Sequence, residues 1–257
     1  DGGLCEVTVG RRDSDEELTV SIPDTDDDAT ALSTSLWPSA LAGSILLRST
    51  ELRSSLSGKD ILELGSGLGL AGLIAANAPA KKCILTDKDD AAVEALSDSA
   101  SRNEVKGCEI LARTLDWRDT GKVDASVDVV IGTDLAYYFF LLRPLMDAAQ
   151  SHLSADDGIF YVVGQANRET QWDLFNNIVD GCYNQLTDQR EPPWPGVTKM
   201  LLYDLTIGPW GSDGGSDDGD TLESEEIPIA VLMHLTEPGR LSSIMSATDH
   251  VATKADE

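Results

Sequence analysis

The sequence is poor in basic residues. Only 19 of its 257 residues are Lys or Arg, against 45 Asp or Glu, so the formal net charge is −26 at pH 7. A charge of this sign repels phosphate backbones and anionic lipid headgroups. We therefore expect neither nucleic acid nor membranes as partners. A solubilising role explains the acidity about as well as a basic protein substrate does.

Long apolar runs and paired cysteines are also lacking. No apolar stretch approaches the about 18 to 20 residues that cross a bilayer, and the first residues lack the pattern of a signal peptide. We expect a soluble protein. The cysteines are scattered without a C-x-x-C motif or a nearby His, which predicts no metal site and free thiols in the cytoplasm, with the nucleus as a further location. They are Cys5, Cys83, Cys108 and Cys182.

From residue 59 onward, short apolar runs alternate with segments of helical periodicity. This β-α alternation predicts a Rossmann-like, doubly wound α/β sheet that is mostly parallel and covered on both faces. The predicted strands are 60–64, 82–86, 109–114, 127–132 and 158–163, and the predicted helices are 68–78, 91–103, 139–153 and 169–183.

The two ends of the chain extend this pattern. Residues 4–9 and 17–22 indicate an N-terminal hairpin, and a helix is expected from Pro38 past Leu52. Strands at 199–207 and 227–235 have no helix between them and should pair antiparallel, giving seven strands with one reversed. The expected divisions are a hairpin and acidic linker (1–33), a catalytic domain (34–236) with an acidic, disordered loop (208–226), and a tail (237–257).

The glycine-rich stretch ILELGSGLGLAG at 61–72 has two interpretations. From Gly67 it matches the G-x-G-x-x-G pattern of dinucleotide-binding enzymes. From Glu63 it matches E-x-G-x-G-x-G, a pattern associated with S-adenosylmethionine. The predicted strand already meets Gly65, and the reversed strand at the end of the sheet is foreign to a parallel dinucleotide sheet. Both points favour the second interpretation and make Gly72 a helix-packing residue.

Ligands of such sheets bind beyond the carboxyl ends of the strands. Gly65, Gly67 and Gly69 lie there, where the missing side chains let the backbone approach a ligand and the N–H groups that open the next helix can hold an anion. Asp87 ends the next strand, where a carboxylate can accept hydrogen bonds from a ribose diol. Its alternative role is to cap the helix that follows.

Four landmarks in this order resemble the seven-β-strand methyltransferases of the methyltransferase-16 group, which are mainly lysine methyltransferases. The resemblance spans 37–235 and implies S-adenosyl-L-methionine as the cofactor and a lysine ε-amine of a protein as the acceptor. The landmarks are LWP at 36–38, ELGSGLG at 63–69, LDW at 115–117 and the D-x-x-Y motif at 134–137.

Carried over residue by residue, the resemblance implies a cofactor site. Trp37 would line the methionine end, Gly65, Ser66 and Gly67 would pass beneath it, Asp87 would bind the ribose, Asp116 and Trp117 would flank the adenine, and Thr133 would lie beside the cofactor. Glu63 is a further candidate, with ordering of the loop as its alternative role. Trp37 and Trp117 have an alternative as core aromatics.

The acceptor side is assigned to Asp134 and Tyr137, the catalytic candidates. A methyl acceptor must be unprotonated and aligned, which a carboxylate and an aromatic wall can achieve. A helix cap with a packed tyrosine is the alternative. The aromatic residues 138–140 are expected to pack on a helix face, with a substrate channel as the second interpretation.

The function expected is protein-lysine methylation dependent on S-adenosylmethionine. A small-molecule N- or O-methyltransferase and a non-catalytic binding module are the alternatives. After strand five, Arg168 matches the family while Gln165 and Ala166 do not, so we expect an altered acceptor pocket. The sequence leaves open arginine or histidine as acceptor, the number of methyl groups and the oligomeric state.

Overall fold

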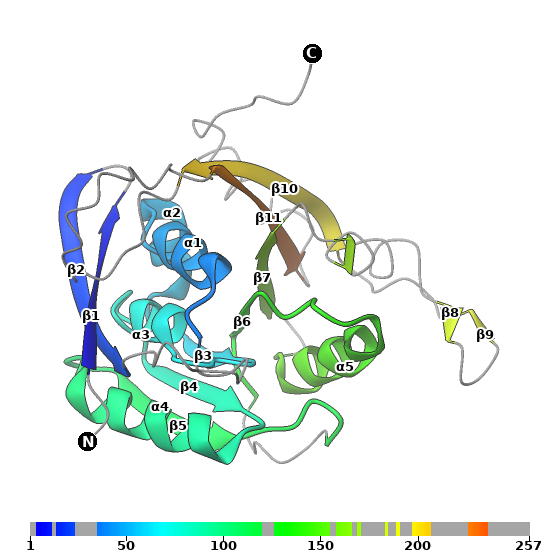
Figure 1. Ribbon diagram of the computed structural model, residues 1–257, viewed down its shortest axis with the longest axis horizontal. Coiled ribbons are helices and arrows are strands. Elements are labelled where there is room, and N and C mark those ends of the chain that lie inside the picture. The colour runs from blue at the N-terminus through cyan, green and yellow to red at the C-terminus, as the bar shows by residue number, and fades with distance from the viewer. Residues whose placement is uncertain are drawn as a thin grey trace, which may run out of the picture.

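A computed structural model of the chain describes residues 4–11, 14–23, 35–119, 126–154, 158–165, 169–170, 183–184, 189–190, 197–206 and 226–235. A seven-stranded sheet flanked by helices forms the centre of the fold (Figure 1). Its strands are β3 (Asp60–Glu63), β4 (Lys82–Asp87), β5 (Glu109–Thr114), β6 (Val129–Thr133), β7 (Ile159–Gln165), β10 (Val197–Thr206) and β11 (Glu226–Leu235).

The strands lie in the order β10-β11-β7-β6-β3-β4-β5 across the sheet. Strands β3 to β7 are mutually parallel, and β11 pairs antiparallel with both β7 and β10. The predicted Rossmann-like sheet with one reversed strand in a C-terminal hairpin is confirmed. The chain runs from β3 outward to β5 and then returns to β6 on the other side of β3. The strand order therefore reverses beside β3, where sheets of this type bind their ligands.

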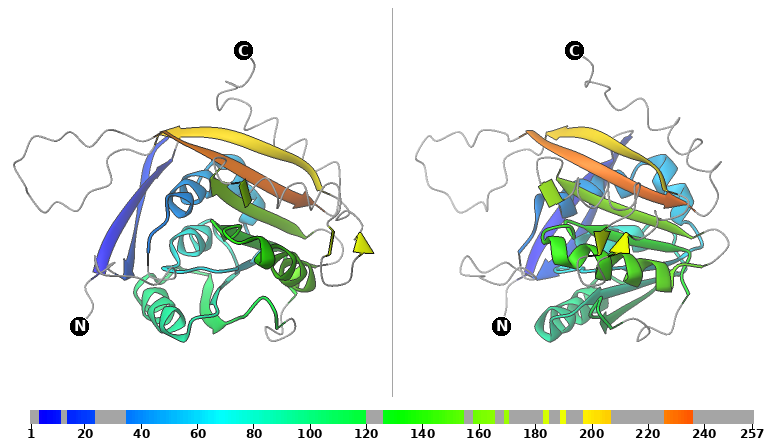
Figure 2. Two further views of the ribbon diagram at one scale, coloured as in Figure 1. Left: turned by 45° about the vertical axis from the view of Figure 1, so that its right-hand side comes forward. Right: turned by 90° about the vertical axis from the view of Figure 1, so that its right-hand side faces the viewer.

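Helices cover both faces of this sheet (Figure 2). Alternate residues of each strand face opposite sides, so Ile61 and Ile131 pack with α1 and α3, whereas Leu62 and Val130 pack with α5. The apolar runs of the central strands supply both layers of the core. The helices are α1 (Pro38–Leu47), α2 (Thr50–Leu56), α3 (Leu70–Ala76), α4 (Asp90–Arg102) and α5 (Leu142–His152).

The N-terminal hairpin is longer than predicted, with β1 at Leu4–Arg11 and β2 at Ser14–Pro23. Its apolar side chains, Val7 and Val20 among them, join the core that contains α1 and α3. Figure 1 shows the hairpin beside these helices and apart from the main sheet. The hairpin thereby covers one flank of the helical layer.

The helix expected from Pro38 past Leu52 is interrupted, so this part of the prediction was wrong. Arg48 ends α1, and Ser49 adopts an extended conformation before α2 begins. The buried guanidinium of Arg48 donates hydrogen bonds to the carbonyl of Val9 and, at 3.1 Å, to the carbonyl of Glu16. The break therefore coincides with the attachment of the hairpin to α1.

Several expectations lie outside the described residues. They concern most of the helix at 169–183, the loop at 208–226, the tail, and the family positions at 166–168. Two short strands that the sequence did not predict, β8 (Tyr183–Asn184) and β9 (Gln189–Arg190), pair antiparallel. Cys5, Cys83 and Cys108 carry free thiols. None of the described helices combines the length and apolar character needed to span a membrane.

We expect Arg48→Met to lower the free energy of unfolding by about 3 kcal/mol, because two hairpin carbonyls lose a charged, buried donor. Arg53→Met is the matched control, since Arg53 makes only a partly exposed ion pair with Glu16 at 4.0 Å. Arg53→Met should lower the free energy of unfolding by less than about 1 kcal/mol. Urea unfolding followed by circular dichroism measures both changes, and equal losses would contradict this role of Arg48.

Candidate active site

The turn after β3 runs through left-handed backbone that glycine adopts readily. The φ angles of Gly65, Gly67 and Gly69 are 58°, 51° and 82°. A Cβ on Gly65 would lie 2.7 Å from Leu135 Cδ2 and 3.0 Å from Trp117 Cζ2. The turn thus passes directly against these two side chains, with room for no side chain at position 65.

Hydrogen bonds join this turn to the end of β4. The backbone N–H of Ser66 donates to the carbonyl of Thr86 at 2.8 Å, and Ser66 Oγ accepts from the Thr86 N–H at 2.9 Å. Asp87 Oδ2 accepts from the Gly67 N–H at 3.1 Å, and its Oδ1 accepts from the Asp89 N–H at 3.1 Å. The carboxylate therefore fixes the turn as well as its own strand end.

Asp89, and not Asp87, caps α4. Its side chain accepts from the N–H of Ala91 at 3.1 Å. This geometry removes the alternative in which Asp87 is only a helix cap. Burial raises the pKa of Asp87, and the N–H groups of Asp89 and Gly67 oppose that rise by stabilising the charged form.

A cavity of about 580 Å³ opens above the glycine turn. Its size is ordinary for a small-molecule site. It is lined by residues that follow β3, β4, β5 and β6 and by the segment that leads into α1. Ten residues expected from the sequence line it: Trp37, Gly65, Ser66, Gly67, Asp87, Asp116, Trp117, Thr133, Asp134 and Tyr137.

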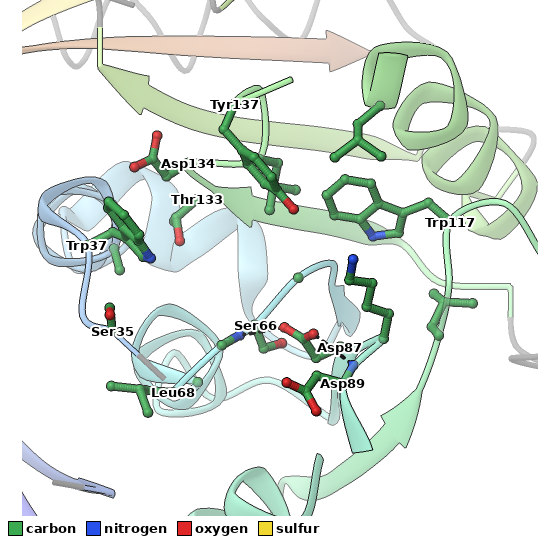
Figure 3. Close-up of a pocket in the computed structure, with 18 of the residues that line it drawn as sticks. Ser35, Trp37, Ser66, Leu68, Asp87, Asp89, Trp117, Thr133, Asp134 and Tyr137 are labelled. Carbon is green, nitrogen blue, oxygen red and sulfur yellow. Dashed lines mark hydrogen bonds between the residues drawn. The ribbon is translucent and has the colours of Figure 1, made fainter. Parts of the chain in front are cut away.

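The polar and aromatic side chains divide between two ends of this cavity. Figure 3 shows Trp37, Thr133 and Asp134 on one side and Asp87 and Trp117 on the other. Tyr137 lies between the two groups, and its hydroxyl points toward the side of Trp117 and Asp87 (Figure 3). An elongated ligand with different groups at its two ends fits this arrangement.

Glu63 does not line the cavity. It is 1% exposed, and a Cβ on Gly72 of α3 would lie 2.4 Å from its Oε2. Burial raises the pKa of Glu63 to about 8, with Ser66 and Gly72 acting in the opposite direction. This placement favours the loop-ordering role that the sequence left open. It also makes Gly72 a packing residue, as the sequence indicated.

Asp116 faces a partner that the sequence analysis missed. Arg118 donates to both carboxylate oxygens, from Nη2 at 2.5 Å and from Nε at 3.0 Å. This pairing lowers the pKa of Asp116 to about 2. Arg118 and Lys88 also line the cavity. Lys88 directly follows Asp87 in the sequence, and Arg118 directly follows Trp117. This proximity to predicted site residues could have indicated both cations.

Asp134 occupies an unusual conformation at the end of β6. Its φ is 57°, a region that Asp tolerates better than most residues, and its N–H donates to the carbonyl of Val163 at 2.7 Å. No helix starts there, because the following 3-10 turn begins at Phe139 and α5 begins at Leu142. The helix-cap alternative for Asp134 is therefore excluded.

The aromatic residues after Tyr137 contradict one expectation. Tyr138, Phe139 and Phe140 are 50%, 49% and 71% exposed, so they do not pack on a helix face. The chain forms a 3-10 turn at Phe139–Leu141, which changes the direction in which these side chains project. Tyr137 is more buried, and burial raises its pKa.

A family model described as lysine methyltransferase matches residues 14–180. The chain belongs to this lysine methyltransferase family. Its members transfer methyl groups, and S-adenosylmethionine is the cofactor of this methyltransferase.

Similar proteins agree with this assignment. Protein N-lysine methyltransferase METTL21A of Xenopus tropicalis is 27% identical over 60% of this chain and 73% of its own length. Calmodulin-lysine N-methyltransferase of Arabidopsis thaliana is 28% identical over 66% of this chain and 62% of its own length, so the chain spans less than two thirds of that relative. The 16S rRNA methyltransferase RsmC of T. thermophilus shares the fold, with a TM-score of 0.55 and 14% identity over 91% of this chain and 51% of that one.

We expect the stability of the methyltransferase to depend on Glu63 in a pH-specific way. Because its pKa rises from 4.5 to about 8 on folding, the folded protein retains a proton that the unfolded chain releases. The free energy of unfolding should therefore fall by about 1.4 kcal/mol per pH unit as the pH rises through this window. Glu63→Gln removes this dependence, so its stability relative to the wild type should increase from pH 5 to pH 8.

Denaturant unfolding at several pH values tests this expectation. Glu94→Gln, at an exposed position of α4, is the control and should follow the wild type at every pH. Parallel curves for Glu63→Gln and the wild type would contradict a buried, protonated Glu63.

Replacing Asp87 by Ala should weaken S-adenosylmethionine binding by about 1.5 to 3 kcal/mol, the scale of a hydrogen bond to a charged group. The variant loses both the carboxylate in the cavity and the acceptor of the Gly67 N–H. Titration calorimetry measures the change, and Asp90→Ala, outside the cavity, serves as the control. Unchanged affinity in the folded Asp87 variant would refute the assignment.

Proposed function

We propose that the protein transfers a methyl group to the ε-amine of a lysine in a protein substrate. The observation that carries the proposal is the D-x-x-Y segment, which brings Asp134 and Tyr137 into the same cavity as the glycine turn and Asp87. Two relatives with lysine methyltransferase in their names support the choice of acceptor. We propose the cytoplasm as its location, because the cysteines are few and scattered.

The residues of the cavity fit the cofactor. Asp87 would accept the ribose hydroxyls, Trp117 would contact the adenine, and Trp37 would cover the methionine end, while the glycine turn would present its backbone to the ligand. S-adenosylmethionine supplies, when bound, an electrophilic methyl group on a sulfonium. Asp116 would flank the adenine together with Trp117, and its carboxylate is paired with Arg118.

On the acceptor side, the residues have to bind the lysine side chain, orient its nitrogen and favour its unprotonated form. A lysine enters as an ammonium and must give up a proton before its lone pair can react. The buried carboxylate of Asp134 would accept hydrogen bonds from this nitrogen and stabilise its charge while the proton passes to solvent water before the methyl group is transferred. The ring of Tyr137 would form a wall that orients the side chain and limits access of water.

A methyl-transfer assay tests the choice of substrate. Cell lysate is incubated with the protein and tritiated S-adenosylmethionine, and label is followed in proteins and in small molecules. We expect labelled protein bands that mass spectrometry resolves to methyl-lysine. Label only in small metabolites would favour the small-molecule alternative, and measured cofactor binding without any transfer would favour a non-catalytic module.

Asp134→Asn should reduce turnover by about 100-fold or more while cofactor affinity stays within about twofold. Asn also tolerates the left-handed backbone at this position, so the change removes the charge without adding strain. Asp147→Asn, in the exposed pair with Arg143, is the control and should keep full activity. Loss of cofactor binding in a folded Asp134 variant would show that this residue serves the donor and not the acceptor.

A further inference from the structure

The rim of the cavity carries an exposed aromatic pair. Among the residues that the structure describes, Tyr138, Phe139 and Phe140 are the exposed large apolar side chains. Tyr138 and Phe140 line the cavity, whereas Phe139 does not. Exposed apolar groups of this size beside a site commonly mark a binding surface. Tyr138 and Phe140 are therefore placed to contact a ligand at the rim of the cavity, whereas Phe139 is not.

The geometry of the pair is ordered. The rings of Tyr138 and Phe140 stack with centroids 5.3 Å apart and an interplanar angle of 12°. Tyr138 in turn meets Tyr137 edge to face, with centroids 5.0 Å apart and an angle of 64°. A continuous row of rings thus leads from the solvent at Phe140 to the half-buried Tyr137.

The charges around this row favour a cation. The cavity lining contains the carboxylates of Asp87, Asp89, Asp116 and Asp134, against Lys88 and Arg118. Arg118 is already paired with Asp116. Arg143, the cation that follows Phe140 in the chain, is paired with Asp147 at 2.8 Å. With a net charge of −26, the whole protein also attracts basic partners.

We propose that the stacked rings of Tyr138 and Phe140 dock a basic peptide segment, in which a Lys or Arg side chain next to the lysine that is methylated contacts the face of Phe140 turned away from Tyr138. The proposal rests on the proposed function and specifies the substrate class of that site. Aromatic faces attract Lys and Arg side chains through the cation–π interaction, and exposed rings can do so without removing any partner. Phe140, at 71% exposure, presents the larger free surface.

Three synthetic peptides serve as probes, each fluorescein-labelled and carrying one central lysine flanked by arginine, leucine or glutamate. Binding to the 257-residue chain is followed by fluorescence anisotropy in the presence of S-adenosylhomocysteine. We expect the arginine peptide to bind most tightly and the glutamate peptide least. Equal affinities for the arginine and leucine peptides would overturn the cationic occupant, and no binding of any peptide would overturn the docking surface.

Substitutions locate the contact. Phe140→Ala should weaken binding of the arginine peptide by about threefold to tenfold, and Phe140→Trp should restore it. Phe139→Ala is the matched control, since Phe139 is the same residue type and is also exposed, at 49%, but lies outside the cavity lining. It should stay within about twofold of the wild type. Equal effects of Phe139→Ala and Phe140→Ala would refute the assignment to the stacked pair.

Failure of the docking surface can be told apart from failure of the proposed function. Methyl transfer to the same peptides is measured separately, with tritiated S-adenosylmethionine. Phe140→Ala should raise KM for the arginine peptide and leave kcat and cofactor affinity unchanged. Binding that depends on Phe140 without any methyl transfer would support the docking surface and count against lysine methylation. Transfer at an unchanged KM in Phe140→Ala would count against the docking surface alone.

Discussion

The site depends on the hydrogen bond from the Gly67 N–H to the carboxylate of Asp87. The register pairs Glu63 of β3 with Leu85 of β4, which places Asp87 two residues beyond the end of β3, beside the start of the glycine turn. A shift of this register by one residue would point Asp87 to the opposite face of the sheet. Parallel pairing of the two strands therefore sets the position of the turn, and the turn forms the floor of the cavity.

Much of this arrangement is readable from the sequence, because it depends on local patterns and on one rule of topology. The strand at Glu109–Thr114 has the same bounds in the prediction and in the structure. The carboxyl ends of parallel strands share one edge of a sheet, so residues as distant as Asp87, Trp117 and Asp134 must gather there. Their common cavity follows from the order of the motifs and needs no knowledge of side-chain positions.

The features that the sequence did not predict depend on how side chains and elements pack, which the apolar and glycine patterns do not specify. The break after α1 coincides with hydrogen bonds from Arg48 to two carbonyls of the hairpin, 39 and 32 residues earlier in the chain. Glu63 points to Gly72 and away from the cavity because α3 packs against the strand end, and the glycine pattern is the same in either case. The apolar spacing after Tyr137 suits a helix, yet a 3-10 turn forms first and leaves the rings in solvent.

The residues around the cavity thus come from two kinds of backbone, regular strand ends and an irregular segment. The residues proposed to bind the methyl donor lie at strand ends, whose positions are set by backbone pairing across the sheet and by the hydrogen bonds of Asp87. The residues proposed to bind the acceptor lie on the irregular segment from Asp134 to Leu141, where one residue is left-handed and three aromatic side chains are exposed. Residues 138–140 of this segment are exposed, so substitutions there alter side chains at the rim and remove none from the core. On the proposed function, these positions can therefore change the choice of acceptor while the strand ends that would hold the donor stay in place.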